Sequence, residues 1–171
     1  SEEVNLLMQL LNTALQEEVP NLIKNSVQLS FIGDLSQFDQ ELIEQMKESE
    51  KLTYCDTERK KLDLVVAASY GGRWDIVNAI NKYQDSGSNK ELTEESFDEF
   101  LSTSKFTDPD LCIRTGNELR ISNFLLWQLA YSELYFPDVL WPDFDDQHFD
   151  NALKEYSKRS RRFGDKSNFQ L

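Results

Sequence analysis

Cysteine and histidine are scarce in this chain, which has two cysteines, Cys55 and Cys112, and one histidine, His148, among its 171 residues. Two cysteines without a recurring spacing exclude a disulfide framework and a cysteine-based zinc site. Cys112 lies in an apolar stretch, which favours a small buried thiol. His148 falls in the first turns of the last predicted helix, and we interpret it as solvated rather than catalytic. The low cysteine content indicates a reducing, cytoplasmic environment.

The sequence also lacks long apolar runs and the common nucleotide-binding motifs. No apolar stretch reaches the length of a membrane-spanning helix, and no secretory signal is present. Neither a Walker-type loop nor a dinucleotide fingerprint occurs, so nothing local indicates a nucleotide ligand. The chain begins with Ser1 rather than an initiator methionine, and we expect further residues upstream.

Basic residues are outnumbered, with 18 Lys and Arg against 31 Asp and Glu and a formal net charge of −13. A chain of this charge is repelled by a nucleic-acid backbone or an anionic lipid surface, unless a local basic cluster outweighs the total. We therefore predict no nucleic-acid partner. A hydrophobic content of 39% predicts a globular protein, and the length fits a single domain over residues 1–171.

Apolar residues recur with the period of helices in some segments and of strands in others. The predicted strands are residues 27–32, 62–68 and 110–113, and the predicted helices are residues 4–24, 36–53, 74–83, 93–101, a run starting at 123, and 145–161. We expect Pro20 to end or kink the first helix and residues 62–68 to be covered on both faces. The alternation predicts an α/β fold with a mostly parallel central sheet flanked by helices.

In parallel sheets ligands bind at the carboxyl ends of the strands, and the most informative loop of this chain comes after the strand at 110–113. It holds Arg114 and Arg120 around a Gly116-Asn117 turn and closes on Ser122, where a helix is predicted to begin. A helix N-terminus, two guanidiniums and a hydroxyl together indicate a phosphate or diphosphate site. The alternative is that both arginines pair with some of the many carboxylates. Two other loops, at 33–34 and 70–73, come after strands in the same way.

Glu133 stands inside an otherwise apolar segment, residues 130–136. A carboxylate there must be paired, protonated or bound to a metal, because an unpaired buried charge is very costly. Pairing with an arginine and binding Mg²⁺ are the two alternatives. If a helix ran unbroken from Asn123, Glu133 would lie about 15 Å from its start, too far for one metal to join it to a phosphate at Ser122. Either the helix ends early, or the metal bridges to another part of the chain or to another subunit. The acids of the Trp141–Asp146 segment, by contrast, are typical of a helix start.

Several motifs, in this order, resemble the cis-prenyltransferase family and in particular its bacterial undecaprenyl diphosphate synthase type. They are Ser-Tyr-Gly-Gly-Arg-Trp-Asp at 69–75, Arg-Thr-x-x-Glu-x-Arg-x-Ser-Asn-Phe-Leu-Leu-Trp-Gln at 114–128, Glu-Leu-Tyr-Phe at 133–136, Leu-Trp-Pro-Asp-Phe at 140–144 and Arg-Arg-Phe-Gly at 161–164. The resemblance implies sequential condensation of isopentenyl diphosphate onto farnesyl diphosphate with Mg²⁺. The product is the carrier lipid of cell-wall synthesis. The family is homodimeric, and any membrane association would be peripheral, through the lipid product at the inner face of the plasma membrane.

The resemblance also assigns roles to residues. Arg114, Arg120 and Ser122 would hold the diphosphate of isopentenyl diphosphate, and Glu133 would bind Mg²⁺. Arg162 and Gly164 match an Arg-x-Gly element that reaches the active site of the partner subunit. The strand at 62–68 and the first two helices would help to line an apolar tunnel for the growing chain.

The sequence departs from the family pattern in two ways. Gly116-Asn117 stands where Ser-Gly or Gly-Gly is usual. The Asp-Gly-Asn-Gly-Arg-Trp motif with its essential aspartate, and the Ser-x-Asn-Trp loop, are absent from the chain. We therefore expect the C-terminal part of such a synthase, with the first strand of the sheet and the catalytic aspartate upstream, and no activity from these residues alone. The alternative is a non-catalytic subunit of a two-component cis-prenyltransferase.

Overall fold

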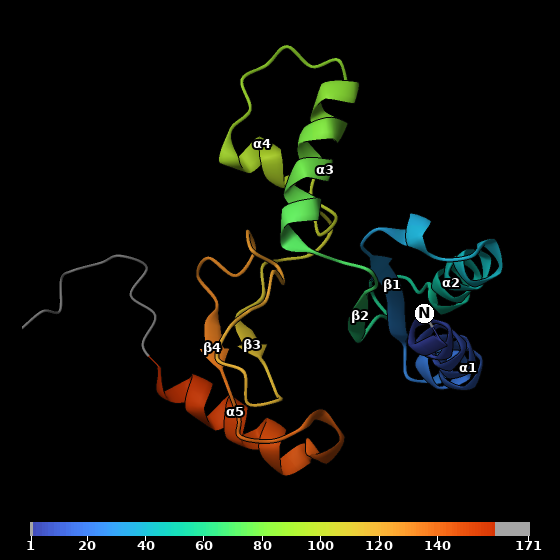
Figure 1. Cartoon of the computed structure of the whole chain (residues 1–171), viewed down its shortest axis with the longest axis vertical. Helices are drawn as coiled ribbons and strands as arrows, with labels where there is room; N and C mark the ends of the chain where they lie inside the picture. The colour runs from blue at the N-terminus through green and yellow to red at the C-terminus, as the bar shows by residue number, and fades with distance from the viewer. Residues whose placement is uncertain (1, 160–171) are drawn as a thin grey trace, which may run out of the picture. The chain divides into compact units, whose positions relative to one another are not determined.

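The computed structural model describes residues 2–159, with side chains from Leu6 onward, and it divides into two compact units at Tyr70 and Gly71 (Figure 1). Each unit combines helices with a parallel strand pair, so the predicted α/β fold class is confirmed. The prediction of a single domain over residues 1–171 is not tested by this division. No helix within residues 2–159 is both long enough and apolar enough to cross a bilayer.

The first unit packs two helices against a parallel strand pair. Its elements are α1 (Glu2–Lys24), β1 (Val27–Ile32), the short 3₁₀ helix Leu35–Gln37, α2 (Gln40–Thr53) and β2 (Leu62–Ala67), and β1 pairs with β2 from Val27↔Leu62 to Ile32↔Ala67. Figure 1 shows α1 and α2 side by side next to β1. Met46 on α2 and Leu29 on β1 are almost fully buried in the core between them.

Local signals account for most boundaries in this unit. Asp39 caps α2, because its side chain accepts the Leu42 N–H (2.8 Å), and the helix therefore starts later than the predicted residue 36. Of the two alternatives predicted for Pro20, ending the helix is wrong, since α1 continues to Lys24, and a kink stays a prediction. The prediction that the second strand is covered on both faces is also not met, because Leu62 and Leu64 are exposed and β2 pairs only with β1 among the described residues.

The loops at the carboxyl ends of β1 and β2 meet, as predicted for a parallel pair. The Asp34 N–H donates to the Ser69 carbonyl (3.2 Å). Gly33 has φ of 120°, and a Cβ on it would clash with the Ala68 carbonyl oxygen. Only glycine permits both this backbone angle and this close approach of the two strand ends.

The second unit combines helices with a second parallel strand pair. Its elements are α3 (Gly72–Asp85), α4 (Glu94–Asp98), β3 (Leu111–Ile113), β4 (Glu133–Tyr135), the 3₁₀ helix Trp141–Asp143 and α5 (Asp146–Lys158). The strands pair from Leu111↔Glu133 to Ile113↔Tyr135. Ala79 on α3 and Phe97 on α4 are buried together, and Trp127 packs against them. Thr93 and Ser96 form a complete capping box for α4.

The structure differs from the sequence prediction at several points in this unit. The helix predicted from residue 123 is absent: residues 122–131 form turns, and positive φ at Ser122 (44°), Asn123 (64°) and Leu125 (44°) interrupts any α-helical run. The strand β4 was not predicted, because it is only three residues long and begins with Glu133. The last helix ends at Lys158 rather than 161.

Candidate functional site

The loop after β3 is anchored by backbone hydrogen bonds to β4 and the segment beyond it. The Arg114 N–H donates to the Tyr135 carbonyl (2.9 Å), and the Gly116 N–H donates to the Val139 carbonyl (2.8 Å). Gly116 and Asn117, where a turn was predicted, have positive φ angles of 86° and 59°. A side chain at Gly116 would meet no atom within 4 Å, so the backbone angle rather than crowding favours glycine there.

The three residues predicted to bind a diphosphate lie in this one loop. The Arg114 guanidinium donates to Ser122 Oγ (2.8 Å) and to the backbone carbonyl of Arg120. The Arg120 side chain pairs with Glu118, with 2.5 Å between Nη1 and Oε2. The structure therefore joins Arg114 to Ser122, whereas for Arg120 it shows the alternative, which was pairing with a carboxylate.

Arg114 differs from Arg120 in the charge of its partners. Within residues 2–159, both acceptors of its guanidinium are neutral oxygens, and no ion pair joins it to a carboxylate. A guanidinium without a carboxylate partner is well suited to a phosphate group, which it can bind through two parallel N–H donors. Arg114 is only partly exposed, and its charge is consequently less screened by water than that of a fully exposed side chain.

The helix N-terminus that was predicted to complete this anion site does not form. The turn at Ser122 and Asn123 carries no row of unpaired helical N–H groups, because both residues have positive φ. The candidate diphosphate site consequently consists of the Arg114 guanidinium and the Ser122 hydroxyl, with Arg120 beside them in its pair with Glu118.

Asn123 has a different role, as the cap of α3. Its backbone carbonyl accepts the Gly72 N–H (2.7 Å), and its side-chain Oδ1 accepts the Arg73 N–H (2.9 Å). The residue before α3 is Gly71, which has no side chain to serve as a cap. A Cβ on Gly72 would lie 2.7 Å from Leu126 Cγ, so this close contact requires a glycine. Asn123 thus ties the end of the arginine loop to α3, a role not predicted from the sequence.

Asp75 is the second residue that sequence reasoning missed. It is fully buried on α3, and its carboxylate accepts hydrogen bonds from the Ser102 N–H (2.9 Å) and from Gln128 Nε2 (3.3 Å). Gln128 Nε2 also donates to Thr103 Oγ1 (2.8 Å). A buried carboxylate is stable only when it is hydrogen-bonded, and here it joins three segments of the unit. The available signal was an acid among apolar residues within the first turns of a predicted helix.

Glu133 is paired with an arginine. It is the first residue of β4, and its Oε2 lies 2.7 Å from Arg159 Nη1. The parallel register places Glu133 opposite Leu111, so Arg114 lies three residues further along β3, roughly 10 Å away at about 3.3 Å per residue. Residues 2–159 contain no group of three or more His, Cys, Asp or Glu side chains that could hold a metal. As arranged, Glu133 does not fit a directly bound Mg²⁺ ion shared with a diphosphate at Arg114.

The acids that precede α5 are structural, as predicted. Asp145 Oδ1 accepts the His148 N–H (3.0 Å) and lies 2.6 Å from His148 Nδ1. These hydrogen bonds, the one from the backbone N–H above all, hold the pKa of Asp145 below its ordinary value. His148 therefore takes part in the helix cap, which the prediction of a solvated side chain did not include. Arg162 and Gly164 lie outside the described residues.

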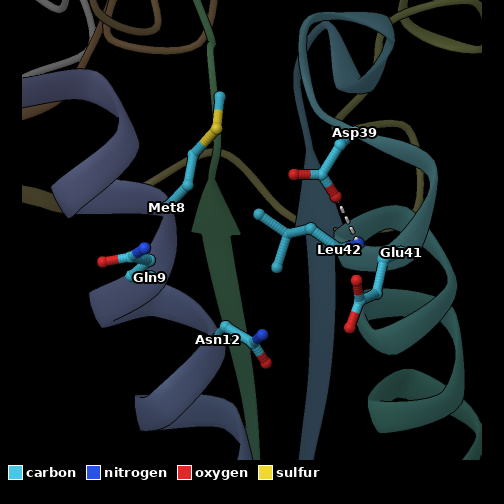
Figure 2. A pocket seen from close by; sticks show the side chains of 6 residues that line it. All are labelled: Met8, Gln9, Asn12, Asp39, Glu41 and Leu42. Atoms are coloured by element: carbon cyan, nitrogen blue, oxygen red, sulfur yellow. Dashed lines mark hydrogen bonds between the residues drawn. The ribbon is translucent and has the colours of Figure 1, made fainter. Parts of the chain in front are cut away.

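The first unit contains an apolar cavity of about 580 Å³. It is lined from α1, from the segment before α2 and from the end of β2, by Leu7, Met8, Leu11, Gln37, Phe38, Val66, Ala67, Ala68 and Ser69. These are elements from which the apolar tunnel was expected. A smaller cavity of about 280 Å³ shares Met8 with it but is polar: Figure 2 shows Gln9 and Asn12 of α1 across from Asp39 and Glu41 at the start of α2.

Comparison with known proteins places this chain among prenyltransferases. The family model for undecaprenyl diphosphate synthase matches residues 1–164. An isoprenyl transferase of Nitrosomonas europaea is 48% identical over 166 residues, which cover 96% of this chain and 62% of that protein. A farnesyl-diphosphate-specific ditrans,polycis-undecaprenyl-diphosphate synthase of Yersinia pseudotuberculosis is 48% identical over 168 residues, covering 95% of this chain and 66% of that protein.

Two solved structures are similar to the chain over almost its whole length. A lavandulyl diphosphate synthase from Lavandula x intermedia, in complex with dimethylallyl diphosphate, has a TM-score of 0.89 at 35% identity and covers 96% of this chain and 72% of its own. A probable undecaprenyl diphosphate synthase from Campylobacter jejuni has a TM-score of 0.84 at 36% identity, with 96% and 76% covered. The chain spans slightly less than two thirds of the length of the two curated relatives, 62% and 66% respectively.

Proposed function

The chain belongs to the undecaprenyl diphosphate synthase family of prenyltransferases, and on that premise we propose that it takes part in cis-prenyl transfer and binds the diphosphate of isopentenyl diphosphate at Arg114 and Ser122. The observation that carries this proposal is the Arg114 guanidinium, which hydrogen-bonds the Ser122 hydroxyl and has no carboxylate partner among residues 2–159. A diphosphate presents the oxygens that such a pair of donors can bind.

Arg120 would join this site by exchanging its partner. Its pair with Glu118 is solvent-exposed on both sides, at 67% and 39% of the side-chain surface. Exposed ion pairs contribute only about 0–1 kcal/mol, so a diphosphate carrying more charge than a carboxylate can compete for the guanidinium. We propose that Arg120 leaves Glu118 when the diphosphate binds.

The apolar cavity of the first unit would take the hydrocarbon part of the allylic substrate. Its lining of Leu7, Leu11, Phe38 and Val66 offers no charge to a hydrocarbon chain. A concave, mostly apolar surface is what a prenyl chain needs in order to leave water. The substrate we propose for this cavity is farnesyl diphosphate, and the product is a cis-polyprenyl diphosphate for the cell-wall carrier lipid.

Several parts of the prediction go with this proposal and are not tested by the structure or the relatives. They are the Mg²⁺ cofactor, the homodimer with its Arg162 and Gly164 contact, the cytoplasmic location, and peripheral association with the plasma membrane through the product. The comparisons do not support the expectation that the chain on its own is inactive, or the alternative of a non-catalytic partner subunit, since the Nitrosomonas and Yersinia relatives are named as a transferase and a synthase.

The experiment is a paired binding and turnover assay on the purified chain. Isothermal titration calorimetry with isopentenyl diphosphate tests the site, and incorporation of labelled isopentenyl diphosphate into products, starting from farnesyl diphosphate with Mg²⁺, tests the activity. We expect saturable binding and products that lengthen in five-carbon steps. Binding without product would restrict the proposal to the diphosphate site, and absence of both would overturn it.

A further inference from the structure

We propose that Arg159 and Glu133 form a latch that fixes the end of α5 on the first residue of β4, and that Glu133 serves this chain as the acceptor of that latch rather than as a direct ligand of a divalent cation. The latch consists of these two side chains and the Leu134 carbonyl. Arg159 Nη1 donates to Glu133 Oε2 (2.7 Å) and to the Leu134 carbonyl oxygen (3.0 Å). One guanidinium nitrogen thus holds two consecutive residues of the same strand.

Both sides of the latch are fixed by the backbone around them. The Glu133 N–H donates to the Asp110 carbonyl (3.0 Å), which sets the start of β4 beside β3. Arg159 is the residue that ends α5, and its own N–H donates to the Tyr156 carbonyl (3.0 Å). Because each partner belongs to an ordered element, the pair joins two elements rather than two mobile side chains.

The latch is better shielded than the other ion pair at the end of α5. The side chains of Arg159 and Glu133 are 38% and 27% exposed, against 68% and 47% for Lys158 and Glu155. The Lys158–Glu155 pair also lies within the helix, three residues apart, and ties α5 to nothing else. An exposed pair of that kind adds little, whereas a less exposed pair with a second, neutral acceptor has less competition from water.

A divalent cation bound through Glu133 Oε2 would compete with the latch for that atom. It would be brought against the Arg159 guanidinium, whose Nη1 lies 2.7 Å from the same oxygen. Two positive charges at such a separation repel strongly in a partly shielded site. Arg159 and a cation therefore exclude one another at Oε2, and the structure places the arginine there.

A charge swap tests the latch. The variants are Glu133→Arg, Arg159→Glu and the two combined, with Lys158→Glu as the matched control for a reversed charge at the end of α5. Hydrogen–deuterium exchange in β4 and in the last turn of α5 should become about three- to tenfold faster in each single variant. The double variant regains the ion pair but not the hydrogen bond to the Leu134 carbonyl, because a glutamate at position 159 cannot donate to it. Its exchange should therefore be slower than in either single variant without reaching the wild type. Lys158→Glu should leave β4 unchanged. A double variant that exchanges as fast as the single variants would overturn the latch.

Calorimetry with magnesium chloride tests the second half of the proposal. Wild type and Glu133→Gln should have the same affinity for Mg²⁺ to within about twofold, including the case in which neither binds measurably. A loss of tenfold or more in Glu133→Gln would show a direct ligand and overturn the inference. These readouts are independent of isopentenyl diphosphate binding, so a failure of the diphosphate site at Arg114 would be seen separately in the Arg114→Ala variant.

Discussion

The two ends of the β3–β4 strand pair use arginine in opposite ways. At the carboxyl end, Arg114 bonds to a hydroxyl and a carbonyl, both neutral, and its positive charge stays uncompensated by any carboxylate that the structure describes. At the amino end, Arg159 faces the Glu133 carboxylate at 2.7 Å, and the two charges cancel. The same side chain therefore leaves positive charge available for an anion at one end and joins two elements at the other.

The difference arises from the contacts that hold each end together. The loop after β3 is tied down by backbone hydrogen bonds, from Arg114 N–H to Tyr135 and from Gly116 N–H to Val139, which do not occupy the guanidinium. At the other end the guanidinium itself makes the connection. Where backbone hydrogen bonds already hold a loop in place, the arginine side chain remains available to a ligand. By this criterion Arg114, and not Arg159, is the arginine available to an anion.

Asp75 joins α3 to Ser102 and Gln128, and its removal should have the largest effect. In Asp75→Ala, Ser102 N–H and one donor of Gln128 lose their buried acceptor, and we expect the second unit to lose about 2–4 kcal/mol of unfolding free energy. Chemical denaturation measures this free energy. Asp85→Ala, an exposed acid at the end of the same helix, is the control and should be close to neutral. Equal stability of both variants would show that the buried carboxylate does not stabilise the second unit.

Arg114→Ala removes the uncompensated positive charge at the carboxyl end of the strand pair. Loss of a charge-assisted contact costs about 1.5–3 kcal/mol, so isopentenyl diphosphate should bind roughly 10- to 150-fold more weakly, with a matching rise in KM wherever turnover is measurable. Calorimetry gives the affinity. Arg159→Ala is the matched variant at the amino end of the strand pair and should change the affinity for isopentenyl diphosphate by less than about twofold. Equal losses in both would mean that the two ends are not distinct.

Ser122→Ala isolates the hydroxyl that accepts from Arg114. Alanine keeps the Cβ, so the backbone strain at φ of 44° is unchanged and only the 2.8 Å hydrogen bond is lost. We expect isopentenyl diphosphate to bind about two- to tenfold more weakly, from about 0.5–1.5 kcal/mol per hydrogen bond. Ser157→Ala on α5 makes the same chemical change away from the loop and should have no effect. Unchanged affinity in Ser122→Ala would remove the hydroxyl from the site.

The contacts at the two ends of the strand pair also differ in how well they can be predicted from the sequence. Arg114, Arg120 and Ser122 lie within nine residues, so their proximity is a property of the chain itself and was predicted. The ion pair of Glu133 with Arg159 spans 26 residues, and no local pattern indicates which of many basic residues an acid will meet. The sequence therefore left two alternatives for Glu133, and tertiary structure was needed to choose the pair.

Secondary structure was predicted correctly for β1 but not for the apolar run after Asn123, for a related reason. In the first unit, alternation of apolar residues ended by Gly33 located β1 at Val27–Ile32 as the structure has it. In the second unit, the apolar run after Asn123 has helical composition, yet Ser122, Asn123 and Leu125 adopt positive φ. Such angles are unfavourable for these residue types locally and are accepted because Asn123 caps α3. Three-residue strands such as β4 depend on their partner strand in the same way.

Acidification should have the smallest effect, confined to the start of α5. Asp145 caps α5, and its pKa in the folded protein is lowered from the ordinary 3.8, first by the His148 backbone N–H and then by the His148 side chain. A carboxyl group whose folded pKa is depressed contributes stability that is present above its unfolded pKa and is lost as the pH falls through the folded value. The cap should thus hold at about pH 5 and release only below pH 3.8.

The measurement is the chemical shift of the His148 amide proton between about pH 5 and pH 2, a range that spans the loss of the cap. In the wild type it should titrate with Asp145, whereas in Asp145→Asn, which keeps a good capping side chain without a titrating group, it should stay nearly constant over this range. The amides of Arg114 and Gly116 should not follow the Asp145 transition, because their acceptors are backbone carbonyls that do not titrate. If they moved with the same midpoint in the wild type but not in Asp145→Asn, the start of α5 and the arginine loop would be coupled rather than independent.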